Sequence, residues 1–195
     1  MNNRKLLRSQ LIEAWHQAIE FDYKRQRINS ERSLQASIWS KLNKIFDNQP
    51  RRMFIEPSLA VISSATEGQK QIVRVPDLVI CNSREIIGVV EMKYRPNTKP
   101  NYKKDIDTLA WIAENGSNIV ISNYRFRGNI ADAHAYKMAK SVVFVWTGVH
   151  RDKNISLDIP KRLCCTSRKI DAMPPAPDAA MPWHPRAPCS GARVA

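Results

Sequence analysis

Three residues with chemically active side chains interrupt apolar stretches of this 195-residue sequence: Asp77, Glu91 and Lys93. Asp77 directly precedes Leu-Val-Ile, and Glu91 directly follows Val-Val. A carboxylate among apolar neighbours is costly unless a partner binds it. In a β-strand Glu91 and Lys93, two residues apart, project from the same face. These residues are therefore the first candidates for a chemical role.

The spacing of the two acids predicts that they meet. Asp77 lies 14 residues before Glu91. That separation accommodates the rest of one strand, a tight turn at Asn82-Ser83 and a returning strand. We therefore expect a hairpin that brings the carboxylate of Asp77 beside that of Glu91.

Two converging carboxylates form a hard-oxygen site suited to Mg²⁺, which keeps several waters and binds one or two carboxylates together with a substrate phosphate. Such an ion polarises a scissile phosphate and acidifies a bound water. A neighbouring lysine can orient the attacking water and offset negative charge in the transition state. This chemistry predicts a metal site at Asp77 and Glu91, for Mg²⁺ or alternatively Mn²⁺, with Lys93 positioning the water. The alternative is a charge at a strand end, or an ordinary Glu91–Lys93 ion pair.

The elements around these residues follow from the apolar periodicity. Three- and four-residue steps predict a helix over 7–23 and a second helix that begins at Asn29 or Ser30 and ends before Pro50. Pro57 indicates that the first strand is bent or lies at an edge of the sheet. The expected order after the two helices is strands over 53–61, 71–81 and 85–94, a helix over 102–115, a strand over 118–122, a short helix over 131–139 and a strand over 141–147. This order predicts an α/β fold with a mixed β-sheet flanked by helices.

The chain changes in composition near its end. Six of the twelve Pro residues follow Lys161, among Ala and Arg, and no apolar period survives there. We expect one domain over residues 1–160 and a disordered Pro/Ala-rich tail over 161–195. The sequence leaves open that the tail is an out-of-frame extension, or that the chain is a fragment whose intended C-terminus is missing.

The pattern Pro76-Asp77 with Glu91-x-Lys93 resembles that of the PD-(D/E)xK nuclease superfamily, which has the restriction-endonuclease-like fold. The core of that family runs helix, three-stranded meander, helix, strand (αβββαβ), and this order maps onto roughly residues 30–122. The resemblance implies an endonuclease that hydrolyses phosphodiester bonds of nucleic acid with Mg²⁺, with DNA favoured as the substrate. It assigns metal binding to Asp77 and Glu91 and catalysis to these two residues and Lys93.

Members of the family often carry an acid in the helix that precedes the meander, and Glu31 occupies that place. It shares a helical face with Leu34 and Ile38, which puts its carboxylate at the core-facing end of the helix. The resemblance therefore adds Glu31 to the catalytic residues. The alternative is an acid in the first turn that the helix dipole favours, and both roles can hold together.

Composition narrows the classes of function. The chain has 31 Lys and Arg against 18 Asp and Glu, a net charge of +13, and a pI near 9.9. This excess favours a polyanion such as nucleic acid as the partner, although a solubilising basic surface is the alternative. No apolar run approaches the roughly 18 residues of a membrane helix, which argues against a membrane protein. The sequence lacks the glycine-rich motifs of dinucleotide-binding and NTPase folds and the GxSxG of hydrolases.

The four Cys residues have neither zinc-ligand nor disulfide-framework spacing, which predicts a cytoplasmic protein. A homodimer stays open. So does a second class of function, a non-catalytic nucleic-acid-binding or interaction module that retains the nuclease fold. Lys103 and Lys104 are candidates for a phosphate contact or for a solvated helix face. The three tryptophans Trp39, Trp111 and Trp146 are expected in the core rather than as base-stacking platforms.

Overall fold

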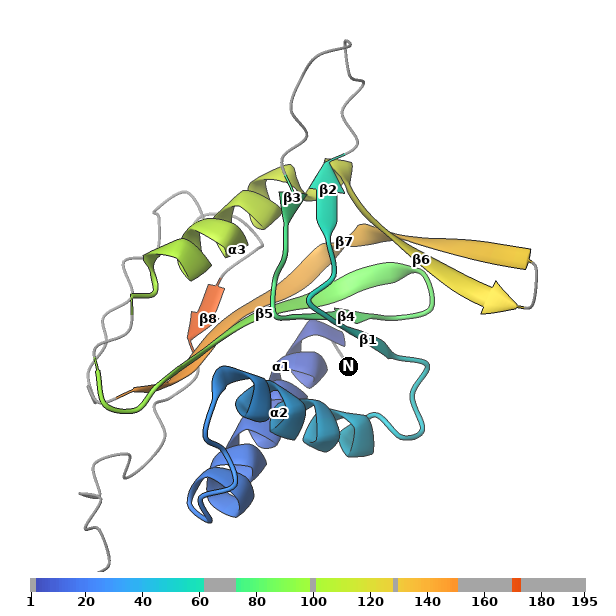
Figure 1. The fold of residues 1–195 in the computed structure, drawn as a ribbon. Coiled ribbons are helices and arrows are strands. Elements are labelled where there is room, and N and C mark those ends of the chain that lie inside the picture. Colours follow the sequence, from blue (N-terminus) through green and yellow to red (C-terminus); the bar gives the residue numbers. More distant parts are fainter. Residues whose placement is uncertain (1–2, 62–72, 99–100, 128–129, 151–169, 173–195) are drawn as a thin grey trace, which may run out of the picture.

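The computed structural model describes residues 3–61, 73–98, 101–127, 130–150 and 170–172. They form a mixed α/β fold built around one β-sheet (Figure 1). The helical elements are α1 (Asn3–Ala18), a π-helical turn (Ile19–Tyr23), α2 (Glu31–Ile45), α3 (Lys103–Asn115) and a 3-10 turn (Gly116–Asn118). The strands are β1 (Arg52–Ile55), β2 (Leu59–Val61), β3 (Val73–Arg74), β4 (Leu78–Cys81), β5 (Glu85–Arg95), β6 (Ile119–Arg127), β7 (Ile130–His150) and β8 (Ile170–Ala172).

The strand order in the sheet is β1-β4-β5-β7-β6-β2-β3, with β8 also paired to β7. Strand β4 runs antiparallel to both β1 and β5, whereas β5 and β7 run parallel. Parallel neighbours need a crossover connection, and α3 lies within it. The expectation of a mixed sheet flanked by helices is confirmed.

The helices cover the sheet from two sides (Figure 1). Apolar residues of α1 and α2 pack against one face, where Leu78, Val90 and Val145 belong to the same core cluster. Helix α3 packs against the other face, where Val89, Phe144 and Trp146 are buried. Because side chains alternate along a strand, consecutive residues of β5 and β7 serve opposite cores.

Several expected elements are confirmed with nearly the predicted bounds. Ser30 is the N-cap of α2, where its side chain accepts from the backbone N–H of Ser33 and the Ser33 hydroxyl accepts from the backbone N–H of Ser30. Helix α3 ends at Asn115, and β5 covers the predicted 85–94. The expected strands over 53–61 and 71–81 each divide into two, because the chain turns at Pro57 and again before Leu78. As anticipated from Pro57, β1 lies at an edge of the sheet.

The short helix expected over 131–139 is wrong. Residues 130–137 pair antiparallel with β6, and they continue without interruption into the predicted final strand as β7. Helix propensity is a weak preference that sheet pairing overrides here. In consequence, β5 pairs parallel with β7, whereas residues 119–122 of the predicted strand over 118–122 lie in β6, which runs antiparallel to β7.

The segment expected to be a disordered tail contains one described strand, β8, whose residues pair parallel with Phe144 to Trp146 of β7. For these three residues the expectation differs from the structure. The rest of 161–195 lies outside the described residues. Among the helices that the structure describes, none is long and apolar enough to span a bilayer.

Candidate active site

Asp77 stands directly before β4 and is held from three directions. Its Oδ2 accepts a 2.5 Å hydrogen bond from the backbone N–H of Met92 in β5. Its carbonyl accepts from the side chain of Gln35 in α2 at 2.8 Å and from the backbone N–H of Glu56 at 3.1 Å. The carboxylate is therefore placed by backbone and helix together, a rigid arrangement suited to a functional group.

Glu91 lies beside Asp77, as the hairpin prediction required. Strand register pairs Leu78 with Val90, so the residues that flank this pair face each other across β4 and β5. Glu91 is only 6% exposed, and its side chain hydrogen-bonds that of Asp77.

The shared burial of these two acids changes their protonation. Burial raises the pKa of Asp77 to about 6, although the hydrogen bonds from Met92 and Glu91 oppose the shift. Burial, together with the negative charges of Asp77 and Asp105, raises the pKa of Glu91 to about 10. Near neutral pH Glu91 thus keeps its proton and donates it to the Asp77 carboxylate. A cation between the two oxygens would replace that proton.

Lys93, the third motif residue, extends from the same face of β5 and is held between two acids. Its Nζ lies 3.4 Å from Glu31 Oε2 and 3.6 Å from Asp105 Oδ1. Burial alone would lower the pKa of Lys93, but the carboxylates of Asp105 and Glu31 outweigh it and raise the pKa. The side chain is therefore an ammonium at neutral pH.

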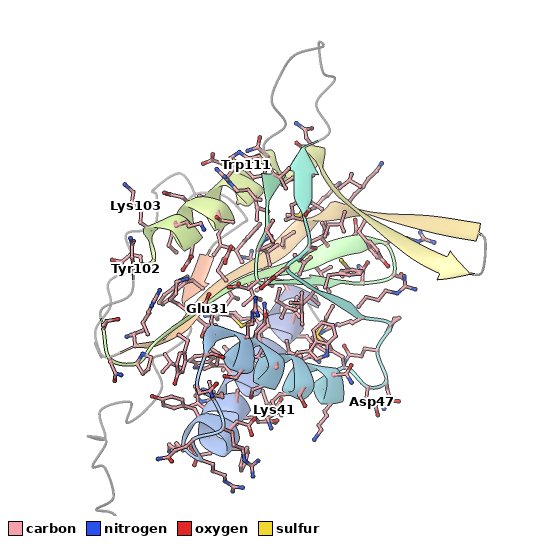
Figure 2. All side chains as sticks on the ribbon, viewed as in Figure 1. Glu31, Lys41, Asp47, Tyr102, Lys103 and Trp111 are labelled. Atoms are coloured by element: carbon pink, nitrogen blue, oxygen red, sulfur yellow. The ribbon has the colours of Figure 1, made fainter. Side chains whose placement is uncertain are left out.

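Glu31 lies in the first turn of α2 and also close to the motif residue Lys93. It opens α2 directly after the Ser30 cap, and Figure 2 shows it at the N-terminal end of the helix, with Asp47 beyond the other end. Its Oε2 accepts from the backbone N–H of Tyr94 at 3.3 Å and faces the Lys93 ammonium. The acid of the preceding helix thus reaches the motif residues in β5.

Asp105, in the first turn of α3, was not predicted as a site residue. It is buried, and it contacts both Lys93 and the indole N–H of Trp146. The sequence carries a signal for it, since Asp105 shares the apolar face of α3 with Leu109 and Ile112. An acid on the buried face of an amphipathic helix needs a partner.

Other candidates lie outside this cluster. Lys103 and Lys104 are exposed at the start of α3, where Figure 2 shows Lys103 and Tyr102. Trp146 is buried as expected, and Trp39 and Trp111 are partly buried against the two cores. These three tryptophans are thus core residues.

The acids fit a cation that needs few protein ligands. Across the described ranges, no group of three or more His, Cys, Asp and Glu side chains is arranged to hold a metal ion. Mg²⁺ commonly uses only one or two carboxylates and completes its shell with water and substrate oxygens. Asp77 and Glu91 are the pair that could serve in this way, because their oxygens already converge and their burial disfavours two uncompensated charges.

Comparisons of the chain with protein-family models, characterised proteins and solved structures gave no match.

Proposed function

We propose that this chain is a metal-dependent nuclease that hydrolyses phosphodiester bonds of nucleic acid, with DNA as the substrate. The observation that carries the proposal is the convergence of Asp77, Glu91 and Lys93 from adjacent strands at one point on the sheet. Both acids would hold the cation, and the lysine lies on the same face of β5.

The order of elements supports the same conclusion. Helix α2, the strands β1, β4 and β5, helix α3 and the parallel strand β7 can be aligned with the αβββαβ order of the PD-(D/E)xK family that the sequence resembles, if β2 and β3 are an insertion between β1 and β4, and β6 an insertion between α3 and β7. The strands β2, β3 and β6 extend the sheet on the far side of β7. In that alignment Asp77 directly precedes the second strand, β4, and Glu91 and Lys93 lie in the third, β5, which supports the proposal.

The chain's own residues divide the work. When bound, Mg²⁺ would polarise the scissile phosphate and acidify a water. Asp77 and Glu91 would hold the ion, and the fixed backbone around Asp77 keeps that position from shifting. The Lys93 ammonium would orient the attacking water and offset charge on the phosphate. Glu31 would assist by keeping Lys93 at the site.

The net charge of +13 supports a polyanionic substrate. The acids around Lys93 would otherwise repel phosphate, so basic residues elsewhere must supply the attraction. Lys103 and Lys104 are exposed at the start of α3, close in sequence to Asp105 of the cluster.

The test is cleavage of a supercoiled plasmid and labelled oligonucleotides by the purified full chain, with Mg²⁺, with Mn²⁺ and with a chelator. We expect metal-dependent cleavage by the natural sequence. Asp77→Asn keeps the shape of the side chain but removes a charge, so cleavage should be lost while DNA affinity persists or rises. Lys93→Ala should lose cleavage and weaken binding slightly.

Matched controls are Asp47→Asn and Lys44→Ala, both at exposed positions near the far end of α2. They should cleave like the natural sequence. Strong cleavage by rigorously purified Asp77→Asn would contradict the assignment of this site. If the natural sequence cleaves DNA with neither ion, and if Asp77→Asn binds DNA with the same affinity as the natural sequence, the non-catalytic binding module is the better assignment.

A further inference from the structure

The Lys93 ammonium connects two carboxylates that differ sharply in exposure. The Glu31 side chain is 42% exposed, that of Lys93 20%, and that of Asp105 only 8%. An exposed ion pair is screened by water and salt and contributes little, whereas a buried charge attracts its partner more strongly. Asp105 is therefore the inner and stronger anchor of Lys93, and Glu31 the outer and weaker one.

Asp105 is itself held in place by β7. Its Oδ2 accepts from the indole Nε1–H of Trp146 at 3.4 Å, while its Oδ1 faces the lysine. One carboxylate oxygen thus serves each neighbour. Tyr102 packs edge-on against the Trp146 ring, which fixes the indole relative to the start of α3.

A glycine in β7 makes this approach feasible. Gly148 stands opposite Lys93 in the register of β5 and β7. A Cβ at position 148 would lie 3.0 Å from the Lys93 carbonyl oxygen and 3.3 Å from both Lys93 Cβ and the Trp146 ring. Glycine in a strand otherwise weakens it and often marks a close approach. Here it leaves room for the lysine stem and the indole side by side.

We propose that Asp105, oriented by Trp146, is a positioning residue that holds the Lys93 ammonium at the candidate active site. The inference rests on the proposed nuclease function and adds to it a residue from α3 that the sequence motif does not contain. Burying a carboxylate together with a lysine costs desolvation free energy, so such a pair stabilises a fold only weakly. Its value lies in fixing where the ammonium stands relative to Asp77 and Glu91.

The test compares Asp105→Asn and Trp146→Phe with Asp107→Asn, which makes the same substitution at an exposed position of the same helix. Asp105→Asn keeps an acceptor for the indole but loses the charge, and Trp146→Phe keeps an aromatic ring but loses the donor. We expect kcat for DNA cleavage to fall by about tenfold or more in Asp105→Asn, with KM within about twofold. The kcat of Trp146→Phe should fall less, and that of Asp107→Asn should not change.

A second readout does not depend on activity. Acetylation of each lysine is followed by mass spectrometry on the metal-free full chain. Once released from Asp105, Lys93 swings into solvent, so its labelling should speed up several-fold in Asp105→Asn. Lys41, whose side chain is 17% exposed and paired with Asp22, is the internal reference and should not change.

The outcomes separate this inference from the proposed function. If the natural sequence does not cleave DNA, the nuclease proposal falls, and the labelling alone decides whether Asp105 holds Lys93. If the natural sequence cleaves while Asp105→Asn and Trp146→Phe keep its kcat, Asp105 is only a structural ion-pair partner and the inference is overturned. Unchanged labelling of Lys93 in both variants would overturn the inference as well. Where one variant folds poorly, unchanged labelling in the other would overturn it.

Discussion

The carboxyl groups of Asp77 and Glu91 lie close together and are buried, so that without a cation only one of them is ionised near neutral pH. Because Glu91 keeps its proton in the folded chain, the free energy of unfolding depends on pH. Since burial raises the pKa of Glu91 from 4.5 to about 10, the folded chain keeps a proton that the unfolded chain has released over that range. By proton linkage, this group's contribution to stability is full below about pH 4.5 and is lost as the pH rises towards 10.

Glu91→Gln removes this dependence, because an amide does not titrate. In metal-free buffer the free energy of unfolding of the variant should decline less between pH 5 and 9 than that of the natural sequence. At the alkaline end the variant should be more stable by at least about 1 kcal/mol. Thermal melts across the pH series measure this, with Glu85→Gln at an exposed position of the same strand as control. Parallel curves for Glu91→Gln and the natural sequence would contradict a protonated Glu91.

Glu31→Gln tests whether the outer acid acts on the site or only on its helix. The amide can still accept from the Tyr94 N–H but no longer attracts the Lys93 ammonium. We expect DNA cleavage to weaken while the melting temperature stays nearly unchanged. A role in the helix dipole alone would instead cost a few tenths of a kcal/mol and leave cleavage intact. Melts and cleavage rates on the same preparation distinguish the two.

The residues differ in how far the sequence reveals them. Asp77, Glu91 and Lys93 lie on one hairpin, whose local spacing dictates their neighbourhood. Asp105 comes close to Lys93 only because α3 packs over β5 and β7, and no local spacing encodes that arrangement. Its single trace in the sequence is an acid on an apolar helix face.

At the scale of elements, the Ser30 cap decides where α2 begins and hence where Glu31 stands. Ser30→Ala removes the acceptor of the Ser33 N–H, a bond of 3.2 Å. We expect a loss of about 1 kcal/mol, or a melting temperature lower by about 2–4 °C for a chain of this size. Ser40→Ala, at an exposed position within α2, is the control and should be neutral or slightly stabilising. Equal melting temperatures for the two variants would contradict the capping role.

Elements with a strong period were predictable, and elements decided by distant pairing were not. Helix α3 and strand β5 each carry a clear apolar pattern within their own residues. The first half of β7 is rich in alanine, which favours a helix locally. It nevertheless pairs with β6 at eight positions, from Val120–Lys137 to Arg127–Ile130. The alternation of alanine with Asp132 and His134 was the overlooked strand signal.

At the scale of the whole molecule, the opposing charges of site and surface must be reconciled. The cluster gathers acids around Lys93, while the chain as a whole carries +13. If the chain binds nucleic acid as proposed, the attraction must come from basic residues around the cluster. Binding of this kind releases counterions, so affinity should fall steeply as salt rises.

Lys103 and Lys104 offer the sharpest measurement of that attraction. The Asp77→Asn chain in chelator binds a labelled DNA duplex without cutting it, and anisotropy titrations from about 50 to 200 mM salt give the slope of log Kobs against log[salt]. If both lysines bind phosphate, replacing them with alanine should make that slope shallower by about 2, near 0.9 for each phosphate that is no longer neutralised. The same double replacement at Lys5 and Lys44, exposed on α1 and α2 across the sheet from α3, should leave the slope unchanged. A slope that responds equally to both pairs would show diffuse attraction by net charge, and one that responds to neither would place the two lysines on a solvated helix face.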